Sequence, residues 1–331
     1  MRVITAPALY GDTESEPRTG SGWINKPIHL HYFISDFRFL KVKFPAMVLT
    51  RSLDPWTPGD NDPQLPLEEF PEGVQALFSS SYPICSPLKR TVRLRNCIRY
   101  VPRQYQNVYV DLSSTFDDYL KAFSTKSRTT LRRKIRKFMD ASGGKIDLRQ
   151  FRLPGEMATF QSLARQVAEK TYQERLFRGG LPSTPAFLEN MELLAEHDSV
   201  RAFLLCYQEK PIAYLYCPVH EGVLRYDFVG HDPQFNELSP GTVLLCLALQ
   251  SLFQECKFRL FNFGQEGVQQ KNQFSTGKVY CADIYYFRPT VRNRVLIGLH
   301  TATERFSKMS GDMLDRLGIK SALKKLMRAR L

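Results

Sequence analysis

The sequence of 331 residues predicts an α/β (α+β) fold, in which a mixed and largely antiparallel sheet is flanked by helices. Residues 223–275 read as strand, turn, helix, strand and helix in succession, and residues 200–219 have the pattern of a β-hairpin. Amphipathic helical patterns occupy residues 114–139 and the C-terminal segment. A smaller N-terminal region and a basic helical C-terminal tail complete the prediction.

The chain divides into four segments, since its length suffices for about two domains with a substantial core. Residues 1–27 are rich in Gly, Ser, Thr, Pro and Glu and are predicted to form a disordered leader. Residues 28–111 contain strand-like runs around a proline-rich acidic loop and are predicted to form an N-terminal α/β region. Residues 112–290 are predicted to be the main domain, and residues 291–331 a pair of basic helices.

Two helices in series are expected between residues 114 and 139. Ser114 and Asp117 have the spacing of a capping box at the start of the first helix. An apolar stripe restarts near Ser127, and this second helix is expected to end near Gly143. The next elements are expected to be a strand at 145–151, a helix at about 155–172 and a short helix at about 186–196.

The rest of the main domain is predicted to supply most of its sheet. Strand-like runs near 200–207 and 211–219 are joined by Gln208-Glu209-Lys210, which predicts a hairpin turn. The remaining elements are expected to be a strand near 223–230, a helix from Pro240, a strand at 258–263, a helix from about Glu266, a strand at 279–287, and two basic helices at about 295–310 and 312–330.

The net charge of +13 is concentrated in two segments. Residues 121–139 hold eight Lys and Arg and no acid, and residues 288–331 hold eleven Lys and Arg against three acids. Each segment therefore carries +8, and the remainder of the chain is close to neutral. Segments of this kind suit an anionic partner, such as a coenzyme, a membrane surface or a nucleic acid.

The composition also bears on the cellular location of the protein and on whether it holds a metal ion. No secretory signal is visible at the N-terminus, and the longest apolar run, residues 243–253, is too short to span a bilayer. Seven cysteines without a C-x-x-C pair fit a reducing cytoplasm, and Cys206, Cys217 and Cys281 are expected to be small core residues. The six histidines are scattered, so no metal site is predicted. We therefore expect a cytoplasmic protein.

The start of the helix at Pro240 has the residue types of a phosphate-binding turn. Ser239 suits a helix N-cap, Pro240 suits the first helical position, and Gly241 lets a ligand approach the backbone closely. The free N–H groups near Thr242 and the helix dipole then favour an anion, such as the pyrophosphate of a coenzyme. A well-capped helix in an α/β core is the alternative interpretation.

Four segments of the main domain resemble one known family. They are FDDYLKAFSTKSRTTLRRKIRKF (116–138), KTYQERLFRGGLP (170–182), YDFVGHDPQFNELSPGTVLL (226–245) and FRLFNFGQEGVQQKNQFSTG (258–277). The amino-acid sequences of these segments, and their order, resemble those of the GNAT acyltransferases. The resemblance is to the branch associated with cellulose and exopolysaccharide biosynthesis, which is related in fold to the Fem aminoacyl transferases. The resemblance covers about residues 112–290, and residues 28–111 would then be a degenerate GNAT-like half.

The resemblance implies transfer of an acyl group from acetyl-CoA or another acyl-CoA to an amine or hydroxyl acceptor, with the coenzyme pyrophosphate at Ser239, Pro240, Gly241 and Thr242. The family pattern at this loop is Gln/Arg-x-x-Gly-x-Gly/Ala, and the stretch from Asn236 to Gly241 keeps only the final glycine. Acyl carrier protein and aminoacyl-tRNA therefore stay open as donors. The resemblance also implies a role in surface polysaccharide or envelope biosynthesis.

Three residues are candidates for the chemistry of acyl transfer, which needs a base for the acceptor and polarisation of the thioester carbonyl. Asp227, in the strand before the phosphate loop, alternates with Tyr226 and Phe228 and is either a base or the partner of an arginine. Glu266 and Lys271 match an acidic-and-lysine pattern of the family. Their alternative roles are an ordinary acid at a helix N-terminus and a solvated lysine.

Acceptor and surface contacts are predicted from two further segments. Tyr172 and Arg175 fall in the loop that GNAT proteins place over the acceptor, where Arg175 would suit a carboxylate or phosphate. The helix from Lys126 to Lys137 has seven Lys and Arg, which form a solvated face, an anionic-membrane contact together with the C-terminal helices, or a nucleic-acid contact. The membrane contact would place the protein at the inner membrane face.

Two further functions remain open beside acyl transfer from coenzyme A. One is a Fem-type aminoacyl transferase, whose basic segments would hold tRNA with a strong dependence on salt. The other is a membrane-associated scaffold that keeps the fold without chemistry, which the incomplete glycine pattern favours. The acceptor, the acyl chain length and the oligomeric state do not follow from the sequence.

Overall fold

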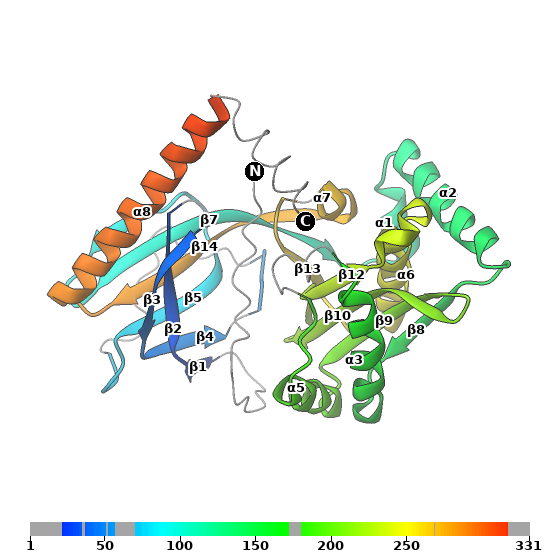
Figure 1. Cartoon of the computed structure of the whole chain (residues 1–331), viewed down its shortest axis with the longest axis horizontal. Coiled ribbons are helices and arrows are strands. Elements are labelled where there is room, and N and C mark those ends of the chain that lie inside the picture. The colour runs from blue at the N-terminus through cyan, green and yellow to red at the C-terminus, as the bar shows by residue number, and fades with distance from the viewer. Residues whose placement is uncertain are drawn as a thin grey trace. The chain divides into compact units, whose positions relative to one another are not determined.

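The structure is a computed structural model that describes residues 22–34, 37–50, 52–56, 70–171, 180–267 and 269–316. It contains two compact units (Figure 1). Unit 1 comprises residues 105–279, and unit 2 comprises the described residues of 21–104 and 280–331. Unit 1 is therefore inserted between two parts of unit 2, and the chain passes between the units within strands β7 (Ile98–Asp111) and β14 (Gly277–Phe287).

Unit 1 is built on a mixed sheet, as the sequence predicts. Its strands lie in the order β7, β13, β11, β10, β9 and β8, and β12 pairs with β10. All these neighbours are antiparallel except β11 and β13, which are parallel. The strand bounds are β8 Asp147–Phe151, β9 Val200–Tyr207, β10 Lys210–His220, β11 Val223–Arg225, β12 Phe228–His231 and β13 Leu260–Gln265.

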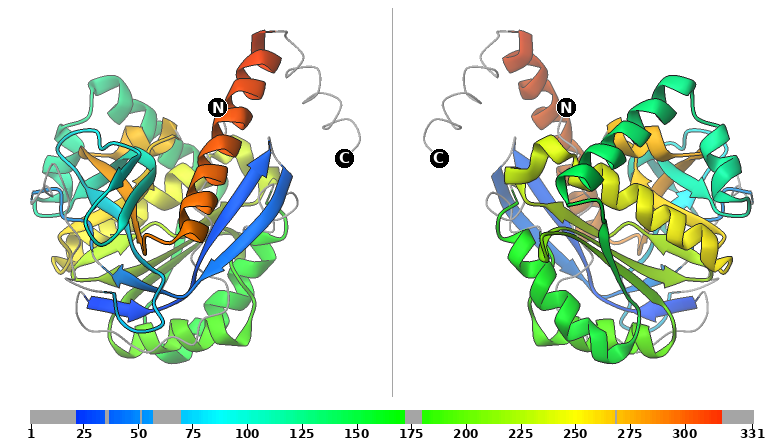
Figure 2. Two further views of the ribbon diagram at one scale, coloured as in Figure 1. Left: turned by 90° about the vertical axis from the view of Figure 1, so that its left-hand side faces the viewer. Right: turned by 90° about the vertical axis from the view of Figure 1, so that its right-hand side faces the viewer.

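Helices cover both faces of this sheet because successive side chains of its strands point to opposite faces. Phe203 and Leu205 of β9 lie in a core cluster with α2 and α6, whereas Ala202 and Leu204 lie in a second cluster with α3 and α5. The right-hand view of Figure 2 shows α2 and α6 lying alongside each other. The helix bounds are α1 Phe116–Lys121, α2 Thr125–Ala141, α3 Pro154–Ala168, α5 Pro185–Glu196, η1 Pro233–Leu238 (a 3-10 helix), α6 Pro240–Glu255 and α7 Gln269–Phe274.

Several local predictions for unit 1 are confirmed. Gln208 and Glu209 have φ angles of 49° and 65°, as a two-residue turn between β9 and β10 requires. Gly143, which follows α2, also has a positive φ, of 71°. The capping box is displaced by one residue, because Thr115 rather than Ser114 accepts the N–H of Asp118.

Unit 2 consists mainly of strands. Its sheet has the order β1, β4, β5, β14 and β7, with β6 paired to β7, and β2 and β3 form a separate hairpin. The strand bounds are β1 Gly22–Asn25, β2 Ile28–Ile34, β3 Phe37–Phe44, β4 Ala46–Thr50, β5 Ala76–Pro83 and β6 Thr91–Arg93. Residues 22–25, which the sequence assigns to a disordered leader, form a strand because β1 pairs with β4.

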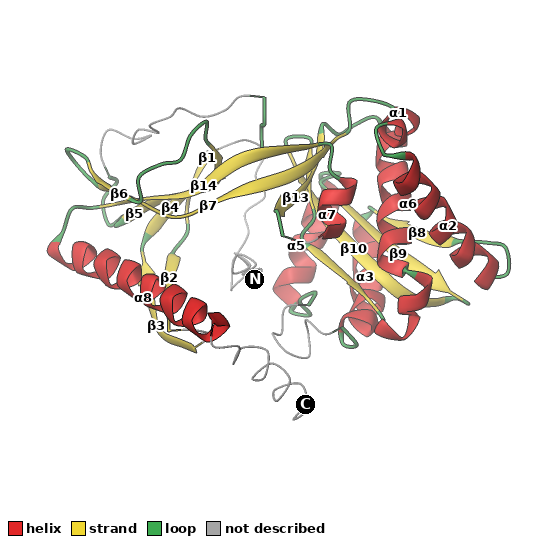
Figure 3. Ribbon diagram, turned by 90° about the horizontal axis from the view of Figure 1, so that it is seen from above, coloured by secondary structure: helices red, strands yellow, loops and turns green. Residues whose placement is uncertain are grey.

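A single helix, α8 (Val291–Arg316), packs along β2 in unit 2, as Figure 3 shows. The sequence predicts two helices here with a break near Gly311, but α8 continues through this glycine. Residues 317–330, the rest of the second predicted helix, lie outside the described residues. In the part of the chain that the structure describes, no helix has the length and apolarity needed to cross a bilayer.

The cysteines follow the prediction in the core. Cys206, Cys217 and Cys281 are at most 1% exposed, and burial raises the pKa of each of the first two thiols. A buried thiol with a raised pKa is poorly reactive, so these residues act as small apolar side chains.

Protonation of a buried histidine should destabilise unit 2 in acid. Burial, and then the charge of Arg90, lowers the pKa of His300 from 6.5 to about 4. Its stabilising contribution is therefore complete above pH 6.5 and is lost as the pH falls toward 4, by up to about 3 kcal/mol. His300→Gln, which keeps a polar partner for the Tyr100 hydroxyl 2.6 Å from His300 Nδ1, should lose less unfolding free energy than the wild type across this interval. Urea unfolding at both ends of the interval measures the difference.

The matched control is His197→Gln, since His197 is exposed. Equal acid sensitivity of His300→Gln and the wild type would contradict the prediction.

Candidate active site

An extra residue in one strand opens the centre of the unit 1 sheet. Val219 of β10 pairs with Leu224 and Tyr216 pairs with Phe228, so three residues, 225–227, face two on β10. This is a β-bulge, a feature that is frequent beside active sites. The parallel pairing of β11 with β13 ends at the bulge, where the Tyr226 N–H donates to the Asn262 carbonyl at 3.0 Å. In the described residues no ladder joins β12 to β13, so the two strands are unpaired beyond this point.

The bulge overturns the strict alternation that the sequence suggests around Asp227. Tyr226 and Phe228, predicted to share a face, pack against different core clusters, and Val229 packs in the same cluster as Tyr226. The physical reason is the extra residue, which shifts the side chains after it to the opposite face. Tyr226 is thereby turned into the core against the rings of Phe261 and Phe263, with centroids 5.9 and 5.3 Å away.

Lys271 lies beside a second irregularity, in β13. The register of β13 against β7 shifts between Asn262 and Gly264, so Phe263 has no partner residue. Lys271 of α7 donates from Nζ to the Phe263 carbonyl at 2.7 Å, and Nζ is 5.6 Å from the centroid of the Tyr226 ring. Burial lowers the pKa of this ammonium below 10.5. Lys271 is therefore a half-buried amine at the place where β12 and β13 are unpaired, not a solvated lysine.

Both candidate carboxylates have basic partners. Asp227 Oδ2 lies 2.6 Å from Arg225 Nη2, so the arginine partner considered from the sequence is present. Glu266 follows β13, and its Oε1 lies 2.5 Å from Lys278 Nζ. Their side chains are 19% and 30% exposed. Both therefore stay within reach of solvent or substrate, as a base that exchanges a proton requires.

The α6 N-terminus, the predicted phosphate site, is open. Ser239 was predicted to cap the helix, but its φ of 54° is left-handed and its side chain makes no capping bond. Its carbonyl instead accepts the N–H groups of Thr242 and Val243 at 3.0 and 3.1 Å. Pro240 occupies the first turn, as predicted. Since Ser239 makes no side-chain capping bond, the positive end of the helix dipole is not neutralised by a cap and can attract an anion.

Two lysines of the basic helix lie at this N-terminus. Lys134 Nζ is 3.3 Å from Thr242 Oγ1, and Lys137 Nζ donates to the Glu237 carbonyl at 3.0 Å. The sequence presents the basic helix and the phosphate turn as separate features, because the contact between α2 and α6 joins residues about a hundred positions apart. A phosphate group at Gly241 would thus meet the helix dipole and a lysine together.

The segment between β12 and α6 is fixed by polar contacts. Asp232 is fully buried, and its carboxylate bonds to Lys170 Nζ and to the Gln234 N–H, each at 3.0 Å. Burial alone would raise the pKa of Asp232, but these two partners outweigh it and the pKa is lowered. His231 Nε2 lies 2.8 Å from Asn236 Oδ1. These contacts tie the loop that leads to the phosphate turn to the rest of unit 1.

Gly241 has room for a side chain. A Cβ there would lie 3.4 Å from His231 Nδ1, which is ordinary contact, and its φ is not left-handed. The fold itself does not require glycine at this position, which is consistent with the close approach of a ligand as its role.

The predicted acceptor residues Tyr172 and Arg175 lie outside the described residues. No group of three or more His, Cys, Asp and Glu within the described ranges is placed to hold a metal ion.

Comparison with known families identifies part of unit 1. Residues 125–271 match the family model described as an acetyltransferase (GNAT) domain. This range contains the α2 lysines, the bulge, the α6 N-terminus and Lys271. No curated protein sequence matches the chain.

Solved structures give partial matches. FemX is 10% identical, with a TM-score of 0.48, and the match covers 83% of this chain and 91% of that one. L-PGS from Bacillus licheniformis is 15% identical, with a TM-score of 0.44 and coverages of 80% and 85%. A conserved protein of unknown function from Bacteroides thetaiotaomicron VPI-5482 is 10% identical, with a TM-score of 0.39. The match covers 59% of this chain and spans 63% of the length of that protein.

The ring of Tyr226 should support the charged form of Lys271. A cation over an aromatic face is stabilised by the ring, so Tyr226→Leu should lower the pKa of Lys271 further below 10.5. Tyr226→Phe keeps the ring and should leave the pKa close to that of the wild type. NMR titration of isotope-labelled lysine, with Lys271 assigned through Lys271→Arg, measures both. An equal shift in the two variants would show that the ring face has no part in the titration.

Proposed function

Since residues 125–271 of this chain form a GNAT domain, we propose that the protein is an acyltransferase that moves an acyl group from an acyl-CoA thioester to an amine or hydroxyl acceptor. The observation that carries the proposal is the open N-terminus of α6 with Lys134 beside Thr242. This arrangement suits the pyrophosphate of coenzyme A, because a helix N-terminus and an ammonium group both attract the anion. Ser239, Pro240, Gly241 and Thr242 would form the backbone cradle.

The reacting end of the donor would lie where β12 and β13 are unpaired. There Glu266 or Asp227 would accept the proton of the acceptor, whose nitrogen or oxygen attacks the thioester carbonyl carbon. The carbon–sulfur bond then breaks, and the thiolate of coenzyme A leaves with the electron pair. Lys271, as an ammonium group, would stabilise the negative charge that develops on the carbonyl oxygen or on the departing sulfur.

A second donor, aminoacyl-tRNA, is favoured by the surplus of cations on α2. A pyrophosphate needs two or three of them, yet Lys126, Arg132, Arg133 and Arg136 are also exposed on this helix. A longer polyanion would engage several at once, and its binding would weaken steeply with salt. The phosphopantetheine phosphate of acyl carrier protein would use the same helix N-terminus.

The cellular location and the biosynthetic role that we propose are those that the sequence suggests. We propose a cytoplasmic enzyme of surface polysaccharide or envelope biosynthesis that contacts the inner face of an anionic membrane through basic segments. In α2 the apolar residues Leu131 and Phe138 are buried in the core, so the exposed surface of this helix is mainly cationic, with Met139 as its exposed apolar side chain. In α8 apolar residues are exposed, which supports α8 as the membrane contact.

Loss of Lys134 should weaken donor binding. Lys134→Gln removes the ammonium group at the α6 N-terminus, and a hydrogen bond to a charged group contributes enough that affinity should fall about tenfold or more. Lys126→Gln is the matched control, because Lys126 is exposed on the same helix and lies outside the α6 contact. Isothermal titration with acetyl-CoA, longer acyl-CoAs and total tRNA at two salt concentrations gives both affinities and identifies the donor.

The two donors predict different patterns. With acyl-CoA, Lys134→Gln alone should be impaired, whereas with tRNA both variants should lose affinity and binding should fall with salt. Gly241→Ala should keep the thermal midpoint of the wild type and bind the donor less tightly. No binding of any of these donors to the wild type would reject both proposals.

Removal of the proposed base or of Lys271 should abolish most of the transfer. Glu266→Gln or Asp227→Asn should lower the rate about a hundredfold or more, whichever carboxylate is the base. Lys271→Met should do likewise, and the wild-type rate should fall as the pH rises through the lowered pKa of Lys271. Thiol release from acyl-CoA, with a panel of amines and alcohols, measures these rates. If all three variants match an active wild type, these residues do not carry the chemistry, and if the wild type releases no thiol with any acceptor, the protein is a non-catalytic scaffold.

A further inference from the structure

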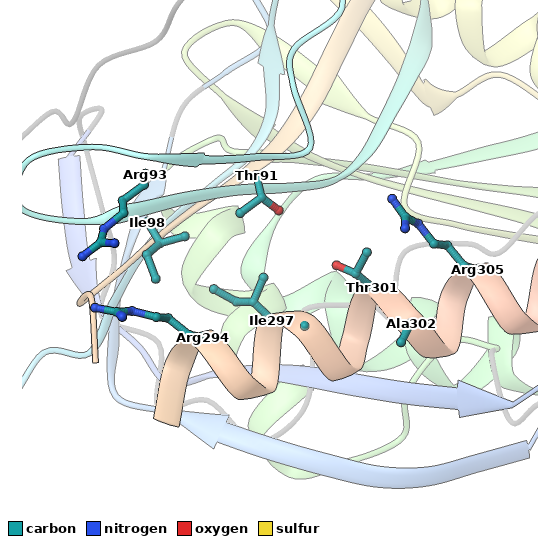
Figure 4. A pocket seen from close by; sticks show the side chains of 9 residues that line it. Thr91, Arg93, Ile98, Arg294, Ile297, Thr301, Ala302 and Arg305 are labelled. Carbon is teal, nitrogen blue, oxygen red and sulfur yellow. The ribbon is translucent and has the colours of Figure 1, made fainter. Parts of the chain in front are cut away.

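Unit 2 has a groove that the proposed chemistry does not use. A cavity of about 420 Å³ lies between the β6–β7 hairpin and α8. Its floor is apolar and includes Ile98 and Ile297. Figure 4 shows Arg93 and Arg294 extending toward the same end of the cavity, with Arg305 at the opposite end.

The charges around this groove are unbalanced. Among the described residues the side chains of Arg93 and Arg305 have no ion pair or hydrogen bond, and the Arg294 guanidinium donates only to the Pro289 carbonyl at 3.1 Å. Within the part of the chain that the structure describes, no acid lines the groove. The neighbouring acid on α8, Glu304, is bound to Arg90. Three guanidinium groups thus share one concave surface without a counter-ion, and a bound anion would relieve their mutual repulsion.

An exposed apolar strip borders the groove along α8. The buried face of the helix, with His300 and Thr303, lies against the unit 2 core, and the arginine face lines the groove. A third face, turned about 90° around the helix axis from the arginine face, carries five apolar residues that are 39–73% exposed, namely Val291, Val295, Leu299, Phe306 and Met309. Apolar residues flanked by arginines on a helix face are typical of helices that lie in a membrane interface.

We propose that this groove binds the phosphate headgroup of an anionic phospholipid, while the exposed apolar face of α8 lies at the edge of the acyl chains. The arginines match the phosphate in charge, and Arg93 and Arg294 reach the same end of the cavity from two different elements. A soluble phosphate would satisfy the arginines and leave the apolar strip in water, so the combination favours a lipid. The inference rests on the proposed contact with an anionic membrane and gives that contact a site.

Vesicle flotation with the full-length protein tests the inference. The wild type should bind vesicles that contain phosphatidylglycerol and should not bind phosphatidylcholine vesicles. Arg93→Gln and Arg305→Gln should each lower the partition coefficient about fivefold, as expected for a cation at a membrane surface. Arg95→Gln is the matched control, since Arg95 is exposed on the same hairpin outside the groove. An equal loss for Arg93→Gln and Arg95→Gln would overturn the groove as a specific site.

A second pair of variants tests the apolar part of the proposed membrane contact. Phe306→Ser should weaken vesicle binding, whereas Leu153→Ser, at a similarly exposed position in unit 1, should not; the two side chains are 58% and 55% exposed. Glycerol phosphate tests the soluble alternative. If it raises the thermal midpoint in an Arg93-dependent way while the wild type ignores anionic vesicles, the lipid proposal is wrong.

Donor binding separates this inference from the proposed transferase function. Arg93→Gln should bind acyl-CoA or tRNA like the wild type. If no donor binds but vesicle binding requires Arg93, the groove stands and the transferase proposal fails. If donors bind and the wild type does not float with anionic vesicles, the groove proposal fails alone.

Discussion

The candidate site depends on one irregularity, the extra residue between β11 and β12. If the strand were regular, Tyr226 would point with Phe228 into the second core cluster, and nothing would separate β12 from the neighbouring β13. The bulge instead ends the ladder at the Tyr226–Asn262 bond and turns the Tyr226 ring toward Lys271. A half-buried amine, whose charged form is penalised by desolvation, is thereby held beside the ring and the Phe263 carbonyl.

The same strand also places the α6 N-terminus. Asp232 ends β12 with its carboxylate buried, and Lys170 and the Gln234 N–H compensate for that burial. The short helix η1 then delivers Ser239 in a left-handed conformation, which takes its side chain away from the capping position. Because Pro240 has no N–H and the Thr242 and Val243 N–H groups donate to the Ser239 carbonyl, the Gly241 N–H is the group of this first turn that is left for a ligand. The departure from the predicted N-cap therefore strengthens the interpretation of this turn as an anion site.

Sequence patterns within windows of about twenty residues were sufficient to predict many helices, strands and turns of the fold. The mixed sheet is expected from the family resemblance, whereas the hairpin turn at Gln208-Glu209, the end of α2 near Gly143 and most strands of unit 1 follow from local periodicity and turn residues. The bulge, the strand β1 and the unbroken α8 do not, because each is fixed by a partner distant in sequence. For the same reason the sequence identifies Lys271 and the phosphate turn as candidates but misses Lys134, whose role arises from the packing of α2 on α6.

The two basic segments show why composition alone does not assign a partner. Each segment carries a net charge of +8, but the two segments differ in whether their apolar residues are buried or exposed. The apolar seam of α2, formed by Leu131 and Phe138, is buried in unit 1, so the exposed surface of the helix is mainly a row of cations that ends at a helix N-terminus without a side-chain cap. α8 buries one face and leaves a second apolar face exposed beside arginines that have no acidic partner among the described residues. The first arrangement suits a compact or extended phosphate anion, and the second suits an anion that carries its own apolar body. Burial of the seam, rather than the count of lysines and arginines, therefore decides which ligand each segment can hold.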